Sequence, residues 1–321
     1  MIGITGCTGF IGGRLGALLA EAGFPLVGLS RRLSSFPVRR IEDFGSLSSL
    51  TAACGGLDTM FHCAGYAHAF SSLSVDDEAL HWQINFEGTR NLVEAAGKAG
   101  VRRFVFLSSV KAMGEPGDRC ADEDFAGLPE AAYGQAKRAA EKAVVEAGRC
   151  YGMHVVNLRL AMVYGSGGRG NLERMGRLVR RGVFPPLPET GNHRSLVHVD
   201  DVVAAMHLVA EDGRANGRTY IVAAPEAPSG RQLYDALREA LGMPRCTWAV
   251  PESALRLAGR VGDGLEAVIR RRLPLDSEVL ERLLGSAWYS PVRIERELGW
   301  RAKVSLADGL REMFGDAATG P

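Results

Sequence analysis

The segment that most constrains what this chain can fold into lies at its N-terminus, in residues 2–13 (IGITGCTGFIGG). In its first half, isoleucine alternates with small residues, as in a short buried strand. Gly6, Gly9 and Gly12 then recur at every third position and lead into an apolar run with helical spacing. The segment therefore predicts a strand, a tight glycine-rich turn and the start of a helix.

A glycine-rich turn between a strand and a helix is suited to bind a phosphate group. The missing side chains permit a tight turn, a close approach of the backbone to a pyrophosphate, and close packing of helix on strand. Free N–H groups at the helix N-terminus attract the anion. Such turns also occur without a ligand, so the spacing GxxGxxG predicts a dinucleotide site only together with other motifs. The expected contacts are Gly6, Thr8, Gly9, Phe10, Ile11 and Gly12.

The length and composition of the chain fit a globular α/β protein. Its 321 residues can form one large domain or a core domain with a smaller partner. The formal net charge is +1 and no basic stripe dominates, which does not favour nucleic acid as a partner. The six cysteines lack metal-binding spacing, and neither a signal peptide nor an apolar run of membrane-spanning length is found. We therefore expect a cytoplasmic protein with reduced thiols and no metal.

Apolar strands alternate with helices up to about residue 165, which predicts a Rossmann-type, doubly wound parallel sheet. The first strand is residues 2–5, and the later strands are expected at 26–29, 41–44, 59–65, 101–107 and 155–164, with helices at 47–53 and 85–96. A lone histidine at the end of a strand, His62, is expected to be structural.

The character of the sequence changes after residue 165, where glycine and proline become frequent. We expect residues 1–165 to form the dinucleotide-binding core and residues 166–321 a smaller substrate-binding region. Within the latter, residues 194–225 are expected to return partly to the core. Further expected elements are strands at 196–199 and 220–223, helices at 230–241 and 254–272, and a frayed tail at 317–321.

The end of the second expected strand bears on the choice of cofactor. A carboxylate at this position would bind the ribose hydroxyls of NAD, whereas an arginine pairs with the 2′-phosphate of NADP. This chain has Ser30, Arg31 and Arg32 there, and no acid. The sequence therefore favours NADP(H) over NAD(H), with both arginines as contacts. The alternative is that both arginines only face solvent.

Tyr133 and Lys137 are four residues apart on an expected helix, so they share one face. A tyrosine has an ordinary pKa of about 10, and a lysine ammonium together with an oxidised nicotinamide would lower it. Tyr133 could then exchange a proton with a carbonyl or alcohol oxygen while hydride moves at the adjacent carbon. Ser109, at the end of an expected strand, can donate a hydrogen bond to the same oxygen. These three residues are the expected catalytic group.

Several short segments carry a resemblance that extends over nearly the whole chain. They are residues 5–12 (TGCTGFIG), 108–109 (SS), 133–137 (YGQAK), 194–201 (RSLVHVDD) and 294–300 (IERELGW). Together they resemble an extended short-chain dehydrogenase/reductase, the group of NAD(P)-dependent sugar-nucleotide epimerases, dehydratases and ketoreductases. The resemblance implies catalysis by Ser109, Tyr133 and Lys137. It also implies further cofactor contacts from Asp43, Ala64, Asn85 and Ser108, besides Tyr133 and Lys137 themselves.

Two departures from the patterns of this family exclude two of its reactions. The 4,6-dehydratases carry an Asp-Glu pair directly after the catalytic Ser or Thr, whereas Val110 and Lys111 follow Ser109 here. The 3,5-epimerising reductases carry a cysteine two residues after that serine, where this chain has Lys111. Ketoreduction or epimerisation at carbon 4 therefore remains, and the missing acid at the ribose position favours an NADPH-dependent 4-ketoreductase.

The resemblance implies a substrate of the UDP-4-keto-6-deoxy-N-acetylhexosamine type, from bacterial surface-polysaccharide synthesis. Alternatives are a nucleotide-sugar 4-epimerase, a reductase of a non-sugar carbonyl such as a steroid, and a catalytically idle cofactor sensor. The expected substrate contacts are Lys111, Asn171 and Arg194. Arg194 suits a phosphate group, because arginine binds phosphate in a bidentate manner. The alternatives are a helix N-cap for Asn171 and a surface ion pair for Arg194. Family members often dimerise, so a homodimer is expected.

Overall fold

The computed structural model describes residues 1–66, 75–168, 170–269 and 277–315 of the chain. At its centre lies a seven-stranded sheet in the order β3-β2-β1-β4-β5-β6-β9, in which all neighbouring strands are parallel. Its strands are β1 (Ile2–Thr5), β2 (Leu26–Ser30), β3 (Val38–Arg40), β4 (Thr59–His62), β5 (Arg103–Ser109), β6 (His154–Leu160) and β9 (Arg218–Val222). The expected doubly wound parallel sheet is confirmed.

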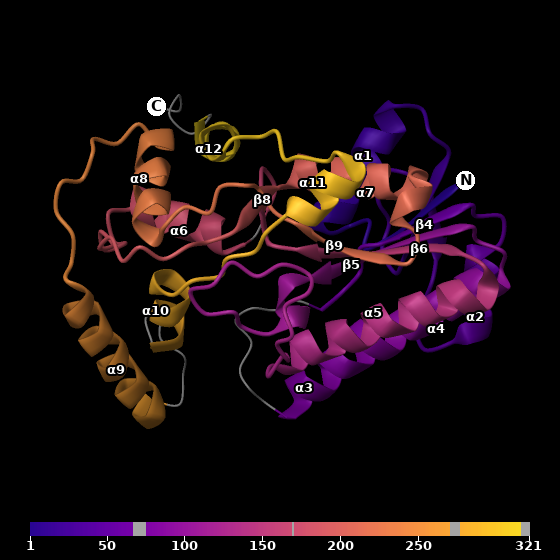
Figure 1. Cartoon of the computed structure of the whole chain (residues 1–321), viewed down its shortest axis with the longest axis horizontal. Coiled ribbons are helices and arrows are strands. Elements are labelled where there is room, and N and C mark those ends of the chain that lie inside the picture. The colour runs from indigo at the N-terminus through magenta and orange to yellow at the C-terminus, as the bar shows by residue number, and fades with distance from the viewer. Residues whose placement is uncertain (67–74, 169, 270–276, 316–321) are drawn as a thin grey trace.

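Helices cover both faces of this sheet (Figure 1). One face carries α1 (Phe10–Glu21), α7 (Val199–Glu211) and α11 (Val292–Leu298). The other carries α2 (Leu47–Cys54), α4 (Gly88–Lys98) and α5 (Ala132–Tyr151). Because both faces are covered, the central strands are apolar throughout, as in β5, where the five residues between its ends are buried.

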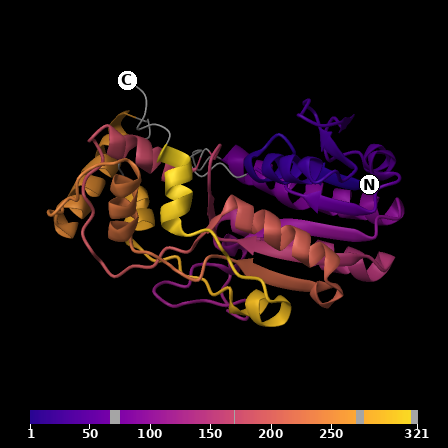
Figure 2. The ribbon, with the colours of Figure 1, turned by 90° about the horizontal axis from the view of Figure 1, so that it is seen from above.

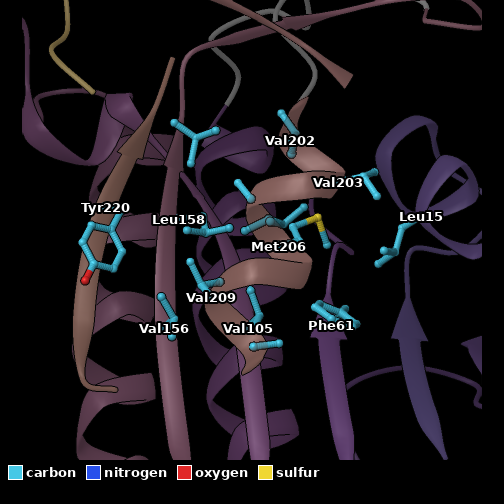
Figure 3. Packing of buried hydrophobic residues seen from close by; sticks show 14 of the residues in the cluster. Leu15, Phe61, Val105, Val156, Leu158, Val202, Val203, Met206, Val209 and Tyr220 are labelled. Atoms are coloured by element: carbon cyan, nitrogen blue, oxygen red, sulfur yellow. The ribbon is translucent and has the colours of Figure 1, made fainter. Parts of the chain in front are cut away.

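The core between α7 and the sheet shows how the layers pack (Figure 3). Val202, Met206 and Val209 of α7 lie against Val105 of β5 and Leu158 of β6, and all five side chains are buried. Burying a side chain of this kind stabilises the fold by about 1.5–3 kcal/mol relative to leaving it exposed. This packing fixes the strand ends that carry the site.

A smaller lobe lies beside one end of the sheet (Figure 2). It contains a two-stranded sheet of β7 (Met162–Tyr164) and β8 (Leu196–His198). Its helices are α6 (Asn171–Arg180), α8 (Gly230–Ala240), α9 (Glu252–Ile269), α10 (Ser277–Leu284) and α12 (Leu306–Phe314), and they share a separate apolar core. Within the described ranges, no helix combines the length and the apolar character needed to cross a bilayer.

Some boundaries differ from the sequence-based expectations. Residues 155–164 form two strands: β6 ends at Leu160, and the chain then leaves the main sheet as β7 to pair with β8. Both halves are apolar, so hydropathy gives no sign of this change of sheet. Of the two strands expected to return at 194–225, only the second, as β9, joins the main sheet. The expected tail at 317–321 and the end of the helix at 254–272 lie outside the described residues.

Two shorter elements also differ. The third strand is Val38–Arg40 and not 41–44. The sequence did not reveal it, because this short edge strand contains two arginines and lacks an apolar pattern. The helix expected at 85–96 begins earlier: α3 (Val75–His81) continues into a π-helix (Trp82–Glu87) and then into α4. Residues Val110–Met113 and Gly213–Ala215 form 3₁₀ turns.

His62, at the end of β4, is buried in a chain of hydrogen bonds. Thr89 donates its hydroxyl proton to the Asn85 carbonyl (2.8 Å), so its oxygen accepts a hydrogen bond from Nε2 of His62 (2.9 Å). Nδ1 of His62 then accepts a hydrogen bond from the Thr5 hydroxyl (2.7 Å). Burial, aided by the charge of Lys137, lowers the pKa of His62 to about 3. The histidine is therefore a neutral link between β1, β4 and α4.

This arrangement makes the stability of the fold sensitive to acid. The unfolded chain protonates His62 below its ordinary pKa of about 6.5, but the folded chain does not. The contribution of neutral His62 to the free energy of unfolding is therefore fully present above pH 6.5. As the pH falls below this value, the free energy of unfolding decreases by at most about 1.4 kcal/mol per pH unit. In urea titrations between pH 7 and pH 5, the wild type should lose more of its free energy of unfolding than His62→Gln. An equal loss in both proteins would contradict this reading.

Candidate active site

The glycine-rich turn connects β1 to α1 and packs against the backbone that follows β4. Gly6 has a φ of 65°, and a Cβ on it would lie 2.7 Å from the backbone nitrogen of Ala64. A Cβ on Gly12 would collide with the Gly6 carbonyl oxygen. Gly9 caps α1 without a side chain, and the first turn of this helix carries no acid. The N–H groups of the helix therefore remain available to an anion, and these residues fit a dinucleotide pyrophosphate.

The end of β2 carries two positive charges. Arg31 and Arg32 are both exposed, and neither side chain has a hydrogen bond or an ion pair within the described part of the chain. The backbone N–H of Arg32 donates to the Ser30 hydroxyl (3.0 Å), which fixes the turn. Asp43 is exposed and its carboxylate accepts a hydrogen bond from Gly45 N–H (2.7 Å). The charge of the two arginines is thus free to act on a ligand.

Asn85 is brought to the same edge of the sheet by the π-helix, where it is buried. Its side-chain amide bonds to both backbone groups of Tyr66: its oxygen accepts from the N–H (2.8 Å), and its nitrogen donates to the carbonyl (2.9 Å). A Cβ on Gly65 would lie 3.1 Å from the Asn85 oxygen and 3.4 Å from the Lys137 nitrogen. The chain leaving β4 therefore passes directly over Asn85 and Lys137.

The three expected catalytic residues come together at this edge. Ser109 ends β5, and Tyr133 and Lys137 lie in the first two turns of α5. The Ser109 side chain lies close enough to the Tyr133 phenol to act on its pKa, and the Ser109 oxygen accepts the backbone N–H of Lys111 (3.2 Å). Lys137 is only 5% exposed, and its ammonium donates to the Leu107 carbonyl (2.8 Å).

Burial sets the charge state of this group. It lowers the pKa of Lys137 to about 8, although the negative charge of Glu141 acts in the opposite direction. It also raises the pKa of Tyr133, and the nearby Ser109 side chain only partly opposes this effect. At neutral pH, Tyr133 is therefore a protonated phenol beside a lysine that is mostly charged. This is the state that a proton donor requires.

A buried network that motif reasoning missed lies behind Lys137. Glu141, one helical turn after Lys137, accepts a hydrogen bond from the Ser108 hydroxyl (2.6 Å) and two from the Arg159 guanidinium (3.0 and 2.7 Å). The four-residue spacing between Lys137 and Glu141 is the signal that could have identified it. The Ser108 hydroxyl therefore already has a partner in this network. The cofactor contact expected of Ser108 stays a prediction.

His81 is a second residue that motif reasoning missed. Its ring lies 5.6 Å from the Tyr133 ring and 4.9 Å from the Tyr66 ring, measured between centroids. The Asn85 amide also lies 3.3 Å from its Nδ1. The His81 ring therefore lies between those of Tyr133 and Tyr66 and contacts both. No recurring motif points to this histidine.

The expected substrate contacts are spread around the site. Lys111 lies two residues after Ser109 and forms an exposed ion pair with Glu115. Asn171 is exposed and is the first residue of α6, but Gly170 is the N-cap, so the alternative reading of Asn171 as the cap is wrong. Arg194 donates to the Gly285 carbonyl (3.3 Å). Their roles toward a substrate stay predictions.

A possible cation-binding group lies where α1, α7 and α12 meet. One ligand atom each of His198, Asp200 and Glu312 lies within 4.8 Å of the others. Both Asp200 oxygens accept hydrogen bonds from Arg14 (2.5 and 2.8 Å). The group is therefore an ion-pair network joining the helices, and the guanidinium competes with any added cation. All six cysteines are free thiols.

Comparison with known proteins agrees with this geometry. Residues 2–223 match the NAD dependent epimerase/dehydratase family. The chain belongs to this family. Membership confirms the expected kind of protein, an NAD(P)-dependent oxidoreductase or epimerase of the extended short-chain dehydrogenase type.

Individual family members are distant but match over nearly their full length. The chain is 28% identical to the UDP-glucose 4-epimerase of Vibrio cholerae, over 96% of this chain and 93% of that protein. It is 26% identical to the 2-alkyl-3-oxoalkanoate reductase of Stenotrophomonas maltophilia, over 98% of each. The solved structure of MoeE5 in complex with UDP-glucose and NAD is 26% identical, with a TM-score of 0.77, and covers 98% of this chain and 97% of that one.

The position of Tyr133 in this epimerase/dehydratase site leads to a prediction. Tyr133→Phe removes the proton donor and should lower turnover at least about a hundredfold, in reduction and epimerisation alike. Cofactor affinity, measured by fluorescence titration, should stay within about twofold. Tyr151→Phe, at the far end of the same helix, is the matched control, because that hydroxyl donates to the half-buried Glu94 (2.5 Å), away from the site. Near-normal turnover of Tyr133→Phe would exclude the assigned role.

Proposed function

We propose that this chain is an NADPH-dependent 4-ketoreductase of a nucleotide-activated sugar, of the UDP-4-keto-6-deoxy-N-acetylhexosamine type. The observation that carries the proposal is the convergence of Ser109, at the end of β5, with Tyr133 and the buried Lys137, in the first two turns of α5. This group lies at the carboxyl edge of the sheet, where open parallel sheets bind their ligands. It supports reduction of a carbonyl with proton transfer to the oxygen.

The chain's own residues account for the proton side of this reaction. A bound nicotinamide supplies the hydride to the carbonyl carbon. Tyr133 donates its proton to the carbonyl oxygen, which becomes the product hydroxyl, and is then reprotonated from solvent. Ser109 still has its own proton to donate, because its described backbone contact is as an acceptor from Lys111 N–H. The ammonium of Lys137 stabilises the phenolate that Tyr133 leaves behind.

Two features at the end of β2 support NADPH as the cofactor. The unpaired charges of Arg31 and Arg32 suit the 2′-phosphate of NADPH, and no acid competes at the end of β2. We assign cofactor binding to residues 1–165 and substrate binding chiefly to residues 166–321. A homodimer and a cytoplasmic location are part of the same proposal.

A nucleotide-sugar 4-epimerase is the second candidate, since the named relatives include UDP-glucose 4-epimerase and a UDP-glucose complex with NAD. Such an enzyme uses the same three catalytic residues but leaves the cofactor unchanged at the end of each turnover. The reductase of an alkylated oxo acid among the relatives favours, as a third candidate, a carbonyl substrate that is not a sugar.

A direct assay separates these candidates. Purified protein mixed with a UDP-4-keto-6-deoxy-N-acetylhexosamine and stoichiometric NADPH should consume one equivalent of NADPH and form a 6-deoxy sugar. Loss of absorbance by reduced nicotinamide gives the rate. Interconversion of ordinary UDP-hexoses without NADPH consumption would instead identify an epimerase. Consumption with 2-alkyl-3-oxo acids alone would identify the third candidate.

The cofactor assignment predicts a change in selectivity. Replacing Arg31 and Arg32 together by alanine should raise the Michaelis constant for NADPH about tenfold or more, because each charged hydrogen bond to the phosphate is lost. The constant for NADH should stay within about twofold. Arg180 and Arg181, an exposed pair at the end of α6, provide the control double variant. Equal losses for both cofactors would mean that the arginines do not read the 2′-phosphate.

A further inference from the structure

Glu141 is a buried carboxylate that the proposed reaction does not use. It lies on α5, one helical turn after Lys137, and is only 5% exposed. Its oxygens accept hydrogen bonds from the Ser108 hydroxyl and from the Arg159 guanidinium. Replacing a buried ion pair by apolar side chains is often neutral or stabilising, because burying the two charges costs free energy. The pair is therefore weak evidence for a purely stabilising role.

The partners of Glu141 come from two neighbouring strands. Ser108 of β5 and Arg159 of β6 are register partners in the parallel sheet, and both side chains reach the same carboxylate on α5. Asn157, two residues before Arg159 and therefore on the same face of the sheet, donates to the Glu141 carbonyl (3.3 Å). Three side chains of the sheet thus fix this turn of α5.

Lys137 and Glu141 bind consecutive residues of β5. The Lys137 ammonium donates to the Leu107 carbonyl (2.8 Å). The Glu141 carboxylate accepts from the Ser108 hydroxyl (2.6 Å). The next residue of the strand is Ser109. These two bonds therefore set the position of α5 along β5 directly before the catalytic serine.

The charge of Glu141 also acts on the ammonium of Lys137. Burial lowers the pKa of Lys137 to about 8, and this effect is opposed by Glu141 and by the Cys63 thiol after β4. The Cys63 thiol is itself buried, which raises its pKa and leaves it uncharged at neutral pH. Of these two groups, Glu141 therefore supplies the full negative charge.

The other titratable groups that the structure describes near the ammonium do not supply such a charge. His62, at the end of β4, is neutral because burial lowers its pKa to about 3. Tyr133, one turn earlier on α5, is a protonated phenol, and His81 of α3 lies beside it. Arg159 pairs with the carboxylate (2.7 Å), so its positive charge weakens the field that the lysine experiences.

We propose that Glu141 is a positioning residue of the reaction: it fixes Lys137 against β5 and holds the ammonium charged, while Arg159 limits the strength of its field. This inference rests on the role that the proposed function gives to Lys137, and it applies to reduction and to epimerisation alike. Two turns of helix, about 12 Å, separate Glu141 from Tyr133. The carboxylate therefore acts through the lysine and does not touch the reacting atoms.

The pH dependence of turnover tests this role, because a merely structural carboxylate would not move it. Glu141→Gln keeps an acceptor for Ser108 but loses the negative charge, so the pKa values of Lys137 and Tyr133 both fall. The alkaline limb of the pH profile of kcat should therefore shift down by about one pH unit. Arg159→Met should shift the limb upwards, because the charge of Glu141 is then no longer offset.

Two further variants keep the test decisive. Glu146→Gln is the matched control, because this glutamate lies on the same helix but is exposed, and it should leave the limb unchanged. Glu141→Gln leaves Arg159 buried without its partner, which can prevent folding. The double variant of Glu141→Gln with Arg159→Met removes both buried charges. It differs from Arg159→Met only at position 141, so its limb should lie about one pH unit below that of Arg159→Met.

Urea unfolding gives a second readout that needs no substrate. The folded chain releases the Lys137 proton near pH 8, whereas the unfolded chain keeps it up to a pKa of about 10.4. The free energy of unfolding therefore rises with pH above about 8, since the unfolded chain then binds more protons. In Glu141→Gln, and in the double variant relative to Arg159→Met, this rise should begin about one pH unit lower.

The outcomes separate this inference from the proposed reaction. An alkaline limb and an unfolding profile that do not move when the charge at position 141 is removed overturn the role of Glu141 and leave the proposed ketoreductase intact. Shifts in the same direction in Glu141→Gln and Arg159→Met show a structural ion pair and also overturn it. A shifted unfolding profile in a protein that does not consume NADPH supports the role and revises only the reaction.

Discussion

Lys137 carries its charge inside the protein, and burying a charge costs free energy unless nearby groups bond to it. The Leu107 carbonyl accepts a hydrogen bond from the ammonium at 2.8 Å, and the Phe106 ring lies 4.7 Å below it. Both groups come from β5, whereas the lysine comes from α5. The packing of α5 on β5 therefore keeps this ammonium largely charged near neutral pH, one helical turn from Tyr133, where the proposed mechanism requires it to stabilise a phenolate.

Parallel strands deliver the remaining parts to the same place. The strands β1, β2, β4 and β5 all end at one edge of the sheet. Four parts of the site therefore meet there: the glycine-rich turn after β1, the arginines after β2, the segment that follows β4 and covers Asn85, and Ser109 at the end of β5. The π-helix adds Asn85, which ties down the backbone leaving β4. The fold thus brings the proposed cofactor cradle and the proposed proton donor to one edge of the sheet, and our proposal assigns recognition of the substrate to the smaller lobe.

Local patterns predicted much of this. The glycine spacing, the Tyr133–Lys137 interval and the position of Ser109 are short-range features, and each has a physical reason that a sequence displays directly. The change of sheet after Leu160 could not be predicted, because both strands are apolar. Contacts between distant segments were also hidden: Arg159 bonds to Glu141 across two elements, and Tyr289 reaches the edge of the sheet from beyond α10. Such contacts depend on tertiary packing, which no local spacing encodes.

The central claim is that hydride passes irreversibly from NADPH to carbon 4 of a nucleotide-linked keto sugar at the Tyr133 site. Transfer of deuterium from NADPH labelled on its reactive carbon tests this most directly, with the product analysed by NMR. The account predicts one deuterium at carbon 4 of the 6-deoxy product, and none when Tyr133→Phe replaces the wild type. Deuterium retained in the cofactor, with UDP-hexoses interconverted, would contradict it.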